Sequence, residues 1–226
     1  ETAPEIPFNS ASKIVLIGDC HRGDGSWVDD FRHNQNLYCA AIKYYYYGGF
    51  TYIDMGDSEE LWKNRKFSDI SGIYTEIYHL LHDFDAAGRY RMIYGNHDFV
   101  KKNPAFMDAN LRRYYNNHTR CFEPLFENPK AYERLILKNS ATKNKILLVH
   151  GHQGDLISDI LWPVGRFLTR HVWRRLELVG HRDPTSAAKN VLERKKVERK
   201  ILEWVTDKNQ PVIAGHTHRP TCPLED

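Results

Sequence analysis

The sequence predicts an α/β fold in which strands and helices alternate along one chain of 226 residues. Short apolar runs rich in β-branched and aromatic residues recur, as in buried strands. Segments with apolar residues at helical spacing separate several of these runs, which is the pattern of βαβ units. Polar residues beside glycine follow most of the runs, and ligands of such folds bind beyond the carboxyl ends of the strands. We therefore expect one α/β domain over residues 1–226 with a site at its strand ends.

The predicted elements begin after a polar segment. Residues 1–12 are polar and include Pro4 and Pro7, so they are expected to form a loose arm. They lack the basic start and apolar centre of a signal peptide. A helix over 34–47 would stop at Gly48 and Gly49, and a second helix is expected over 70–86. Residues 156–205 predict two more helices, broken near 180–184, with Ser186 as a cap of the second. The strands are predicted at 13–17, 51–53, 90–94, 146–149 and 212–214.

Five polar clusters follow these strands and supply only oxygen and nitrogen donors, apart from one thiol. Six of the 12 histidines lie in them, although a single buried histidine is more often a hydrogen-bonded core residue than a ligand. One carboxylate can bridge two divalent ions, and such a pair activates water and stabilises the attacking and leaving oxygens at phosphorus. The clusters therefore predict metal-dependent phosphoryl hydrolysis. They are Gly18-Asp19-Cys20-His21, Gly56-Asp57, Gly95-Asn96-His97-Asp98, His150-Gly151-His152 and Gly215-His216-Thr217-His218.

In their order and span, from Asp19 to His218, the clusters resemble the motifs of the calcineurin-like metallophosphoesterase superfamily. The resemblance implies a four-layer αββα sandwich of two packed sheets, with a helical cap insertion over about 156–205. It also implies a phosphoester or pyrophosphate hydrolase that uses two divalent metal ions. Manganese, iron or zinc suits the mixed imidazole and carboxylate donors better than calcium. Superfamily members usually continue past the last pair of histidines with strands that complete the second sheet, so the end at Asp226 is expected to mean either that the chain is truncated or that its closing strands are missing.

The same resemblance implies a role for each motif residue. Asp57 would bridge the two ions, and the nucleophile would be a hydroxide that lies between them. His97 would act as general acid or charge stabiliser, with Asp98 as its orienting partner. His152 stays outside the metal set, as a neighbour of it. One ion would be held by Asp19, His21, Asp57 and His218, and the other by Asp57, Asn96, His150 and His216.

Within the superfamily, residues 56–62, 95–99, 150–151 and 215–220 are most similar to the UDP-2,3-diacylglucosamine pyrophosphatase branch. Members of that branch carry a helical cap over a lipid-bearing nucleotide sugar. The segment 22–27 departs from their pattern, so the resemblance is partial. Arg22 in this segment is expected either to contact a phosphate beside the metals or to lie on the surface.

The predicted insertion is both basic and apolar, which suits a lid or substrate wall. Arg166, Arg170 and Arg174 recur at four-residue spacing and would form one stripe facing a phosphate or an anionic surface. The alternative is a solvated helix face. The apolar residues between them are expected to pack on the core. The predicted partner is a phosphorylated small molecule or a lipid-linked substrate, and peripheral contact with a membrane and the oligomeric state are left open.

Composition narrows the remaining classes. No apolar run reaches the roughly 18 residues that a transmembrane helix needs. The 4 cysteines show no C-x-x-C spacing, which argues against a zinc finger or disulfide scaffold and favours a reducing cytoplasm. Strand-like alternation turns Cys20 away from Asp19 and His21, so a packed thiol is favoured over a metal ligand. Two alternative functions remain, a nuclease and a non-catalytic metal scaffold. A net charge of only +3 argues against the nuclease.

Overall fold

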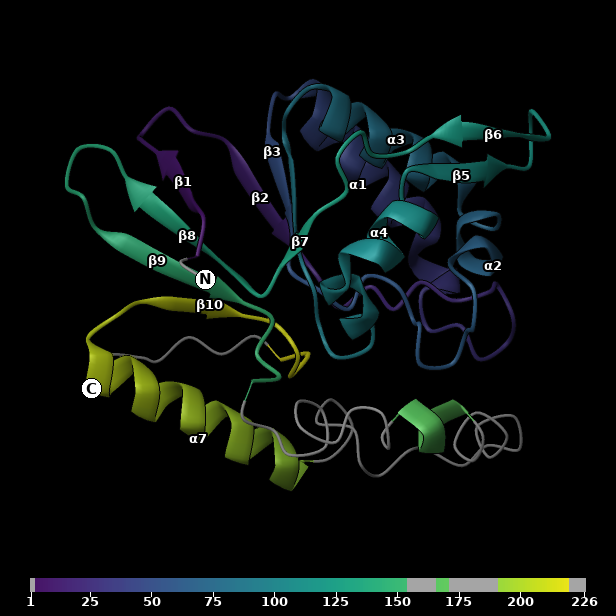
Figure 1. Cartoon of the computed structure of the whole chain (residues 1–226). Helices are drawn as coiled ribbons and strands as arrows, with labels where there is room; N and C mark the ends of the chain where they lie inside the picture. The colour runs from purple at the N-terminus through teal and green to yellow at the C-terminus, as the bar shows by residue number, and fades with distance from the viewer. Residues whose placement is uncertain (1–2, 154–165, 171–190, 220–226) are drawn as a thin grey trace.

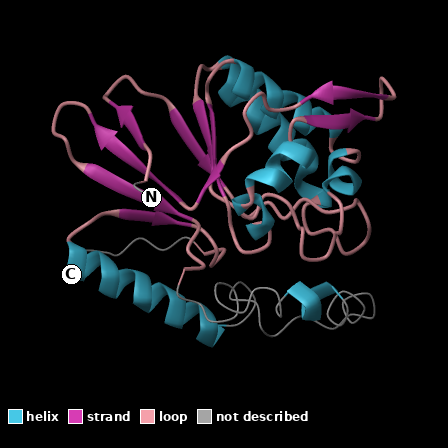
Figure 2. Ribbon diagram, viewed as in Figure 1, coloured by secondary structure: helices cyan, strands magenta, loops and turns pink. Residues whose placement is uncertain are grey.

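Two four-stranded sheets form the centre of the protein (Figures 1 and 2). The structure, a computed structural model, describes residues 3–153, 166–170 and 191–219. In the first sheet all neighbouring strands are parallel, in the order β2 (Ile14–Ile17), β3 (Thr51–Asp54), β4 (Tyr90–Ile93) and β7 (Ala131–Tyr132). The second sheet has the order β1 (Glu5–Phe8), β8 (Arg134–Asn139), β9 (Lys145–Val149) and β10 (Val212–Ala214). There β8 and β9 are antiparallel, whereas β10 runs parallel to β9 and β1 to β8.

Helices cover the outer side of the first sheet, and one long helix lies beside the second (Figure 1). α1 and α3 contact each other over the first sheet, and α7 lies beside β10 on the opposite side of the molecule. A two-stranded hairpin of β5 and β6 extends beyond α3. These elements are η1 (Arg32–Asn34), α1 (Gln35–Tyr47), α2 (Phe67–Ser71), α3 (Thr75–Ala86), η2 (Phe99–Lys102), α4 (Pro104–Asn110), β5 (Arg113–Asn116), β6 (Cys121–Pro124) and α7 (Val191–Lys208).

Two hydrophobic cores hold these layers together. The core between the helices and the first sheet is rich in aromatic residues, and the core between the sheets is mostly aliphatic. Alternation along β3 shows the division, since Tyr52 packs in the first core and Ile53 in the second, both fully buried. Leu135 and Leu148 complete the inter-sheet core from the other side. The predicted αββα sandwich is thus the observed architecture.

The predicted strands agree with the observed ones to within one residue at each end, whereas two other local expectations are wrong. The helix expected over 70–86 is broken, because Gly72 caps α2 by donating from its N–H to the carbonyl of Ser68, and α3 begins at Thr75. The expected loose arm contains β1, whose Ile6 and Phe8 pack against the inter-sheet core. That pairing is with β8, more than a hundred residues away, so no local pattern predicts it.

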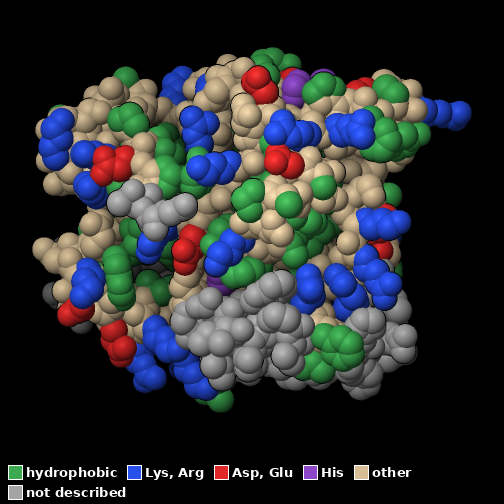
Figure 3. Space-filling model, in the orientation of Figure 1, with side chains coloured by type: hydrophobic (Ala, Val, Ile, Leu, Met, Phe, Trp, Pro, Cys, Tyr) green, Lys and Arg blue, Asp and Glu red, His purple; other side chains and the backbone are tan. Residues whose placement is uncertain are grey.

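Only residues 166–170 and 191–205 of the predicted insertion belong to the described residues. Residues 166–170 are helical, and α7 corresponds to the second predicted helix. Several of its basic residues, among them Lys195, Lys196 and Arg199, are exposed, and Figure 3 shows Lys and Arg side chains at the lower left of the face, where α7 lies. The proposed break at 180–184, Ser186 and Arg174 lie outside the described residues. None of the described helices combines the length and apolarity needed to cross a membrane.

Candidate metal centre

The five polar clusters converge although they come from two different sheets. Asp19, Asp57 and Asn96 follow β2, β3 and β4 of the first sheet, while His150 and His216 follow β9 and β10 of the second. Both sheets end their parallel strands on the same side, so the clusters meet along the seam between the sheets. The sequence predicts that the polar clusters meet at the carboxyl ends of the strands. In the structure they do so, although the strands belong to two sheets rather than one.

A first group able to hold a metal ion consists of Asp19, His21 and His218, whose ligand atoms all lie within 4.8 Å of one another. The Nε2 atoms of His21 and His218 are 3.3 Å apart, and His218 Nε2 is 3.3 Å from Asp19 Oδ1. Asp57 Oδ2 lies 3.7 Å from His21 Nε2. Imidazole nitrogens and carboxylate oxygens thus face one common point, which fits a borderline divalent ion.

A second group lies on the other side of Asp57 and includes His150 and His216, again with all ligand atoms within 4.8 Å. His150 Nε2 is 3.1 Å from Asp57 Oδ2 and 3.2 Å from Asn96 Oδ1. Its Nδ1 is 3.0 Å from the carbonyl oxygen of Met55, an arrangement that orients Nε2 toward the centre, as is usual for metal-binding histidines. Asp57 Oδ2 therefore adjoins both groups. The seven predicted ligands lie together; that they bind ions stays a prediction.

Carboxylates and imidazoles of the centre shift each other's pKa values. Burial raises the pKa of the Asp57 carboxyl, but His150 and His97 outweigh burial and hold this pKa well below its usual range. Burial lowers the pKa of His150, whereas Asp57 and Asp19 outweigh it and raise that pKa to about 10. Protons and divalent ions compete for the same imidazole nitrogens. A buried site that draws protons this strongly also favours a cation in their place.

Five of the seven predicted ligands adopt the left-handed backbone region, which side chains other than glycine rarely occupy. Backbone hydrogen bonds between the clusters hold this conformation: Asp19 donates to the carbonyl of Gly56 at 2.9 Å, and His21 donates to that of Asp57 at 2.8 Å. The strain turns each side chain back toward the seam. The values of φ are 53° for Asp19, 49° for His21, 53° for Asp57, 70° for His216 and 50° for His218.

Two glycines of the clusters provide space for carboxylates. A Cβ at Gly95 would lie on the Asp57 carboxylate, and one at Gly215 would lie 2.5 Å from Asp19 Oδ2. The backbone must approach these oxygens closely, so glycine is required beside the ligand rather than being a general turn residue.

His97 is held by Glu60, which the sequence motifs did not identify as a site residue. Its Nδ1 is 2.9 Å from Glu60 Oε1, and its backbone N–H donates to Asp57 Oδ1 at 2.8 Å. Burial lowers the pKa of His97, but Glu60 and Asp57 outweigh it and raise that pKa to about 9. The other oxygen of Glu60 lies 3.5 Å from His21 Nδ1. The only hint of this contact in the sequence is that Glu60 carries a carboxylate three residues after the candidate ligand Asp57.

Asp98 does not have the predicted role of orienting His97. Its carboxylate instead accepts hydrogen bonds from the backbone N–H groups of Gly95, Ser58 and Asp57, at 2.7, 3.2 and 3.3 Å. It also pairs with Lys101 at 2.7 Å. The physical reason is that the turn after Gly95 directs Asp98 into the protein, away from the His97 ring. Asp98 therefore joins the second and third clusters to each other.

Both expectations for Arg22, contact with a phosphate beside the metals or a position on the surface, are also wrong. Arg22 is fully buried, and its Nη2 donates to Glu59 Oε1 at 2.7 Å. Its guanidinium carbon lies 5.5 and 5.7 Å from the ring centroids of Tyr78 and Tyr38. The ion pair and the two aromatic faces replace water around the guanidinium, which makes burial of this charge tolerable.

The other predicted substrate residues lie in the short helix 166–170. Arg166 is half-buried, and its contact with a phosphate stays a prediction. Arg170 donates to the backbone carbonyls of Leu61, Trp62 and Asn64. Its described contacts are therefore with the protein beside the metal centre.

Two further side chains of the clusters are packed residues. Burial raises the pKa of the Cys20 thiol to about 12, and Cys20 packs against the first core, as expected for a structural thiol. His152 is buried beside the rings of Tyr94 and Phe99, and burial together with His150 lowers its pKa to about 3. Among the described residues, His152 belongs to none of the groups that could hold a metal ion, and its place outside the ligand set stays a prediction.

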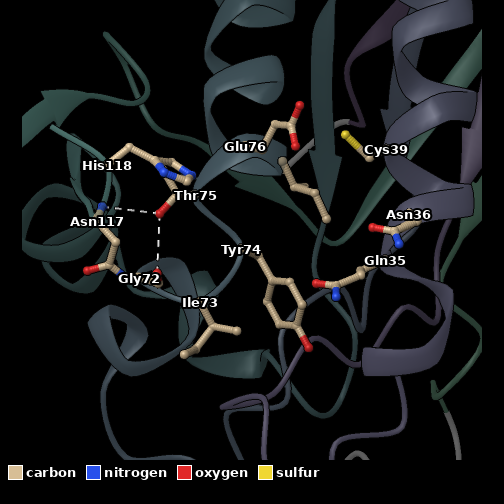
Figure 4. Close-up of a pocket in the computed structure, with 11 residues that line it drawn as sticks. Gln35, Asn36, Cys39, Gly72, Ile73, Tyr74, Thr75, Glu76, Asn117 and His118 are labelled. Atoms are coloured by element: carbon tan, nitrogen blue, oxygen red, sulfur yellow. Dashed lines mark hydrogen bonds between the residues drawn. The ribbon is translucent and has the colours of Figure 1, made fainter.

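A separate hollow of about 260 Å³ lies between α1, the start of α3 and the turn of the β5–β6 hairpin (Figure 4). Cys39, Glu76 and His118 are among the residues that line it. None of the predicted site residues does so. The metal groups at the seam, rather than this hollow, are therefore the candidate functional site.

Comparison with known proteins adds one finding. The family model described as calcineurin-like phosphoesterase matches residues 12–220, which include every cluster of the centre. No curated protein and no solved structure gives a match.

Proposed function

This chain belongs to the calcineurin-like phosphoesterase family, and from that premise we propose that it hydrolyses a phosphoester or pyrophosphate bond at the seam between its two sheets. The observation that supports this proposal best is the meeting of two metal-capable groups on Asp57. Family membership supports a metal-dependent phosphoesterase. The bond that is cleaved and the substrate that carries it are the parts we propose.

The donor set fits two divalent ions, one in each group, with Asp57 shared between them. We propose Asp19, His21 and His218 for the first ion and Asn96, His150 and His216 for the second. Such ions activate a water molecule and stabilise the attacking and leaving oxygens of an in-line displacement. Manganese, iron and zinc all suit these donors. The protein contributes the fixed geometry, which the hydrogen bond between His150 and Met55 and the backbone bonds between the clusters maintain.

We propose His97 as the group that protonates the leaving oxygen or stabilises charge on the phosphoryl group. Its ring is close to the first metal group, with its centroid 4.6 Å from that of His21. Glu60 holds the Nδ1 side of the ring and favours the protonated form, so Nε2 is the nitrogen left to act on a substrate. The pair therefore supplies a positioned proton beside the metals.

Removing this proton donor is expected to slow catalysis without emptying the metal sites. For His97→Ala we expect kcat to fall by about 10² to 10⁴-fold, the usual contribution of general acid–base catalysis. Glu60→Gln removes the charge that orients the ring and is expected to cost about 10 to 100-fold. Metal content, measured by elemental analysis, should stay at the wild-type value in His97→Ala. His33→Ala, an exposed histidine, is the control. Wild-type kcat in His97→Ala would contradict the assignment.

We further propose residues 156–205 as a cap over the centre. Its described part supports this, since Arg170 contacts residues beside His97 and Phe167, Leu168 and Leu192 expose apolar side chains. Exposed apolar groups in a segment that also carries basic residues favour a substrate with both an anionic and an apolar part. A pyrophosphate-linked lipid nucleotide sugar, the substrate of the resembled branch, is the narrower candidate.

A substrate panel is the direct test of this function. Metal-reconstituted protein would be assayed with a chromogenic monoester, a chromogenic diester, UDP-sugars with and without an acyl chain, and oligonucleotides. We expect metal-dependent hydrolysis that a chelator abolishes, with the acylated nucleotide sugar preferred over its non-acylated form. Preference for oligonucleotides would favour the nuclease alternative. Two bound ions without turnover of any panel member would favour a non-catalytic scaffold.

A further inference from the structure

Arg170, in the predicted insertion, binds the turn of residues 60–64 that follows Asp57. Arg170 donates from Nε to the carbonyl of Trp62 at 2.9 Å and from Nη2 to those of Leu61 and Asn64, at 2.9 and 3.1 Å. The planar, multiply donating guanidinium suits three acceptors grouped in one turn, and a lysine could not reproduce this geometry. The side chain is half-buried, so these bonds are partly shielded from water.

The same turn presents two side chains to His97. Glu60 begins the turn and contacts Nδ1 of the ring. Trp62 stacks on the face of the ring, with centroids 4.4 Å apart and planes at 22°. His97 is therefore held at one edge and on one face by a single turn of chain.

Trp62 depends on the backbone of this turn for its orientation. It is only 6% exposed, yet within the described part of the chain its Nε1–H has no hydrogen-bond partner. The orientation of the indole ring is therefore not set by a hydrogen bond of the ring itself. The three carbonyls that Arg170 binds include that of Trp62 itself, so loss of the arginine would remove three of the hydrogen bonds that hold the backbone on either side of the ring.

From these contacts we infer that Arg170 is a positioning residue, which places Trp62 against His97 and thereby fixes the proposed proton donor. The inference rests on the proposed function of His97. It differs from the expectation that Arg170 binds the substrate phosphate. The helix 166–170 must therefore contact the turn for His97 to be aligned. A misplacement of a catalytic group by about 1 Å can lower the rate 10²-fold.

Steady-state kinetics distinguishes positioning from phosphate binding. In Arg170→Gln we expect kcat to fall roughly tenfold to a hundredfold, with KM and inhibition by inorganic phosphate unchanged. A phosphate ligand would instead raise KM and the inhibition constant while leaving kcat unchanged, and that result would overturn the inference. The matched control is Arg89→Gln, because Arg89 also donates to two backbone carbonyls, of Tyr46 and Phe50, away from the centre. It should keep wild-type kinetics.

A double-mutant cycle tests whether Arg170 acts through Trp62. Trp62→Leu removes the stack, and we expect Arg170→Gln to add little further loss in that background. Full additivity of the two effects would contradict the inference. Arg170→Lys keeps the charge but not the planar donor set, so wild-type kcat in this variant would also overturn it.

A spectroscopic measurement tests the geometry independently of turnover. The indole of Trp62 should shift the ring-proton NMR signals of His97 upfield, and these signals are assigned by their loss in His97→Gln. We expect the shift to disappear in Arg170→Gln and to persist in Arg89→Gln. An unchanged His97 signal in Arg170→Gln would overturn the positioning role. If the wild-type protein hydrolyses no substrate, the proposed function fails, while the NMR result still decides whether Arg170 positions the ring.

Discussion

Asp57→Asn is expected to leave a folded protein whose hydrolytic rate is lower by about 10³-fold or more. Asp57 adjoins both proposed ion sites, with Oδ2 at 3.1 Å from His150 Nε2 and 3.7 Å from His21 Nε2. An amide lacks the negative charge that two neighbouring cations require. The loss of several kcal/mol of transition-state stabilisation corresponds to a decrease of this size.

The substitution is conservative for the backbone. Asp57 has φ of 53°, and asparagine tolerates this left-handed region better than most residues. The amide oxygen can also still accept the N–H of His97, the bond that Asp57 Oδ1 now makes. We therefore expect the circular dichroism spectrum and the unfolding transition of a folded protein.

Turnover and metal content measured together give the decisive test. The wild-type protein should bind two ions per chain after reconstitution, and Asp57→Asn should bind fewer and turn over slowly. Asp69→Asn, a change at an exposed aspartate of α2, is the control and should match the wild type. Wild-type rate and two bound ions in Asp57→Asn would refute the assigned bridging role.

The largest effect on stability is expected for Lys101→Met. Lys101 is 2% exposed and pairs with Asp98 at 2.7 Å and with Glu59. Glu59 also accepts from Arg22 and from the hydroxyl of Tyr78, so one arginine would remain for two buried carboxylates. Removing one partner of a buried ion network costs about 3–5 kcal/mol of unfolding free energy, because it leaves a charge without compensation.

Urea denaturation checks this prediction. Lys102→Met is the matched control, since Lys102 is the exposed neighbour and surface substitutions usually change stability by less than about 0.5 kcal/mol. A loss below about 1 kcal/mol in Lys101→Met would show that the network contributes little. Because Asp98 joins the backbone of the second and third clusters, we also expect weaker metal binding in Lys101→Met.

The pH dependence of stability follows from Glu59. Burial raises its pKa, but Lys101 and Arg22 outweigh burial and lower it from 4.5 to about 2. A carboxylate with a lowered pKa contributes fully to stability above the unfolded value, and this contribution is lost as pH falls through the folded value. The difference in stability between wild type and Lys101→Met should therefore shrink between pH 4.5 and 2.

The sequence alone predicted the five strands that precede the clusters, the seven candidate ligands and the family to which the chain belongs. Apolar runs that end in a glycine and a polar residue are local patterns, and parallel strands bring their carboxyl ends together whatever the details of the loops. For this reason Asp19 and His218, 199 positions apart in numbering, were correctly expected at one site, where they now lie 3.3 Å apart.

Only the tertiary structure decided which side chains surround the ligands. Left-handed backbone at five ligand positions, such as Asp57, sets the directions of the loops, and no sequence period encodes these directions. Because of these turns, the carboxylate that contacts His97 is Glu60 rather than Asp98, and the Arg22 side chain lies in the core. In the same way, residues 5–8 form a strand only because they pair with the distant strand β8. Local propensity specifies the elements, whereas long-range packing and charge compensation select the contacts between them.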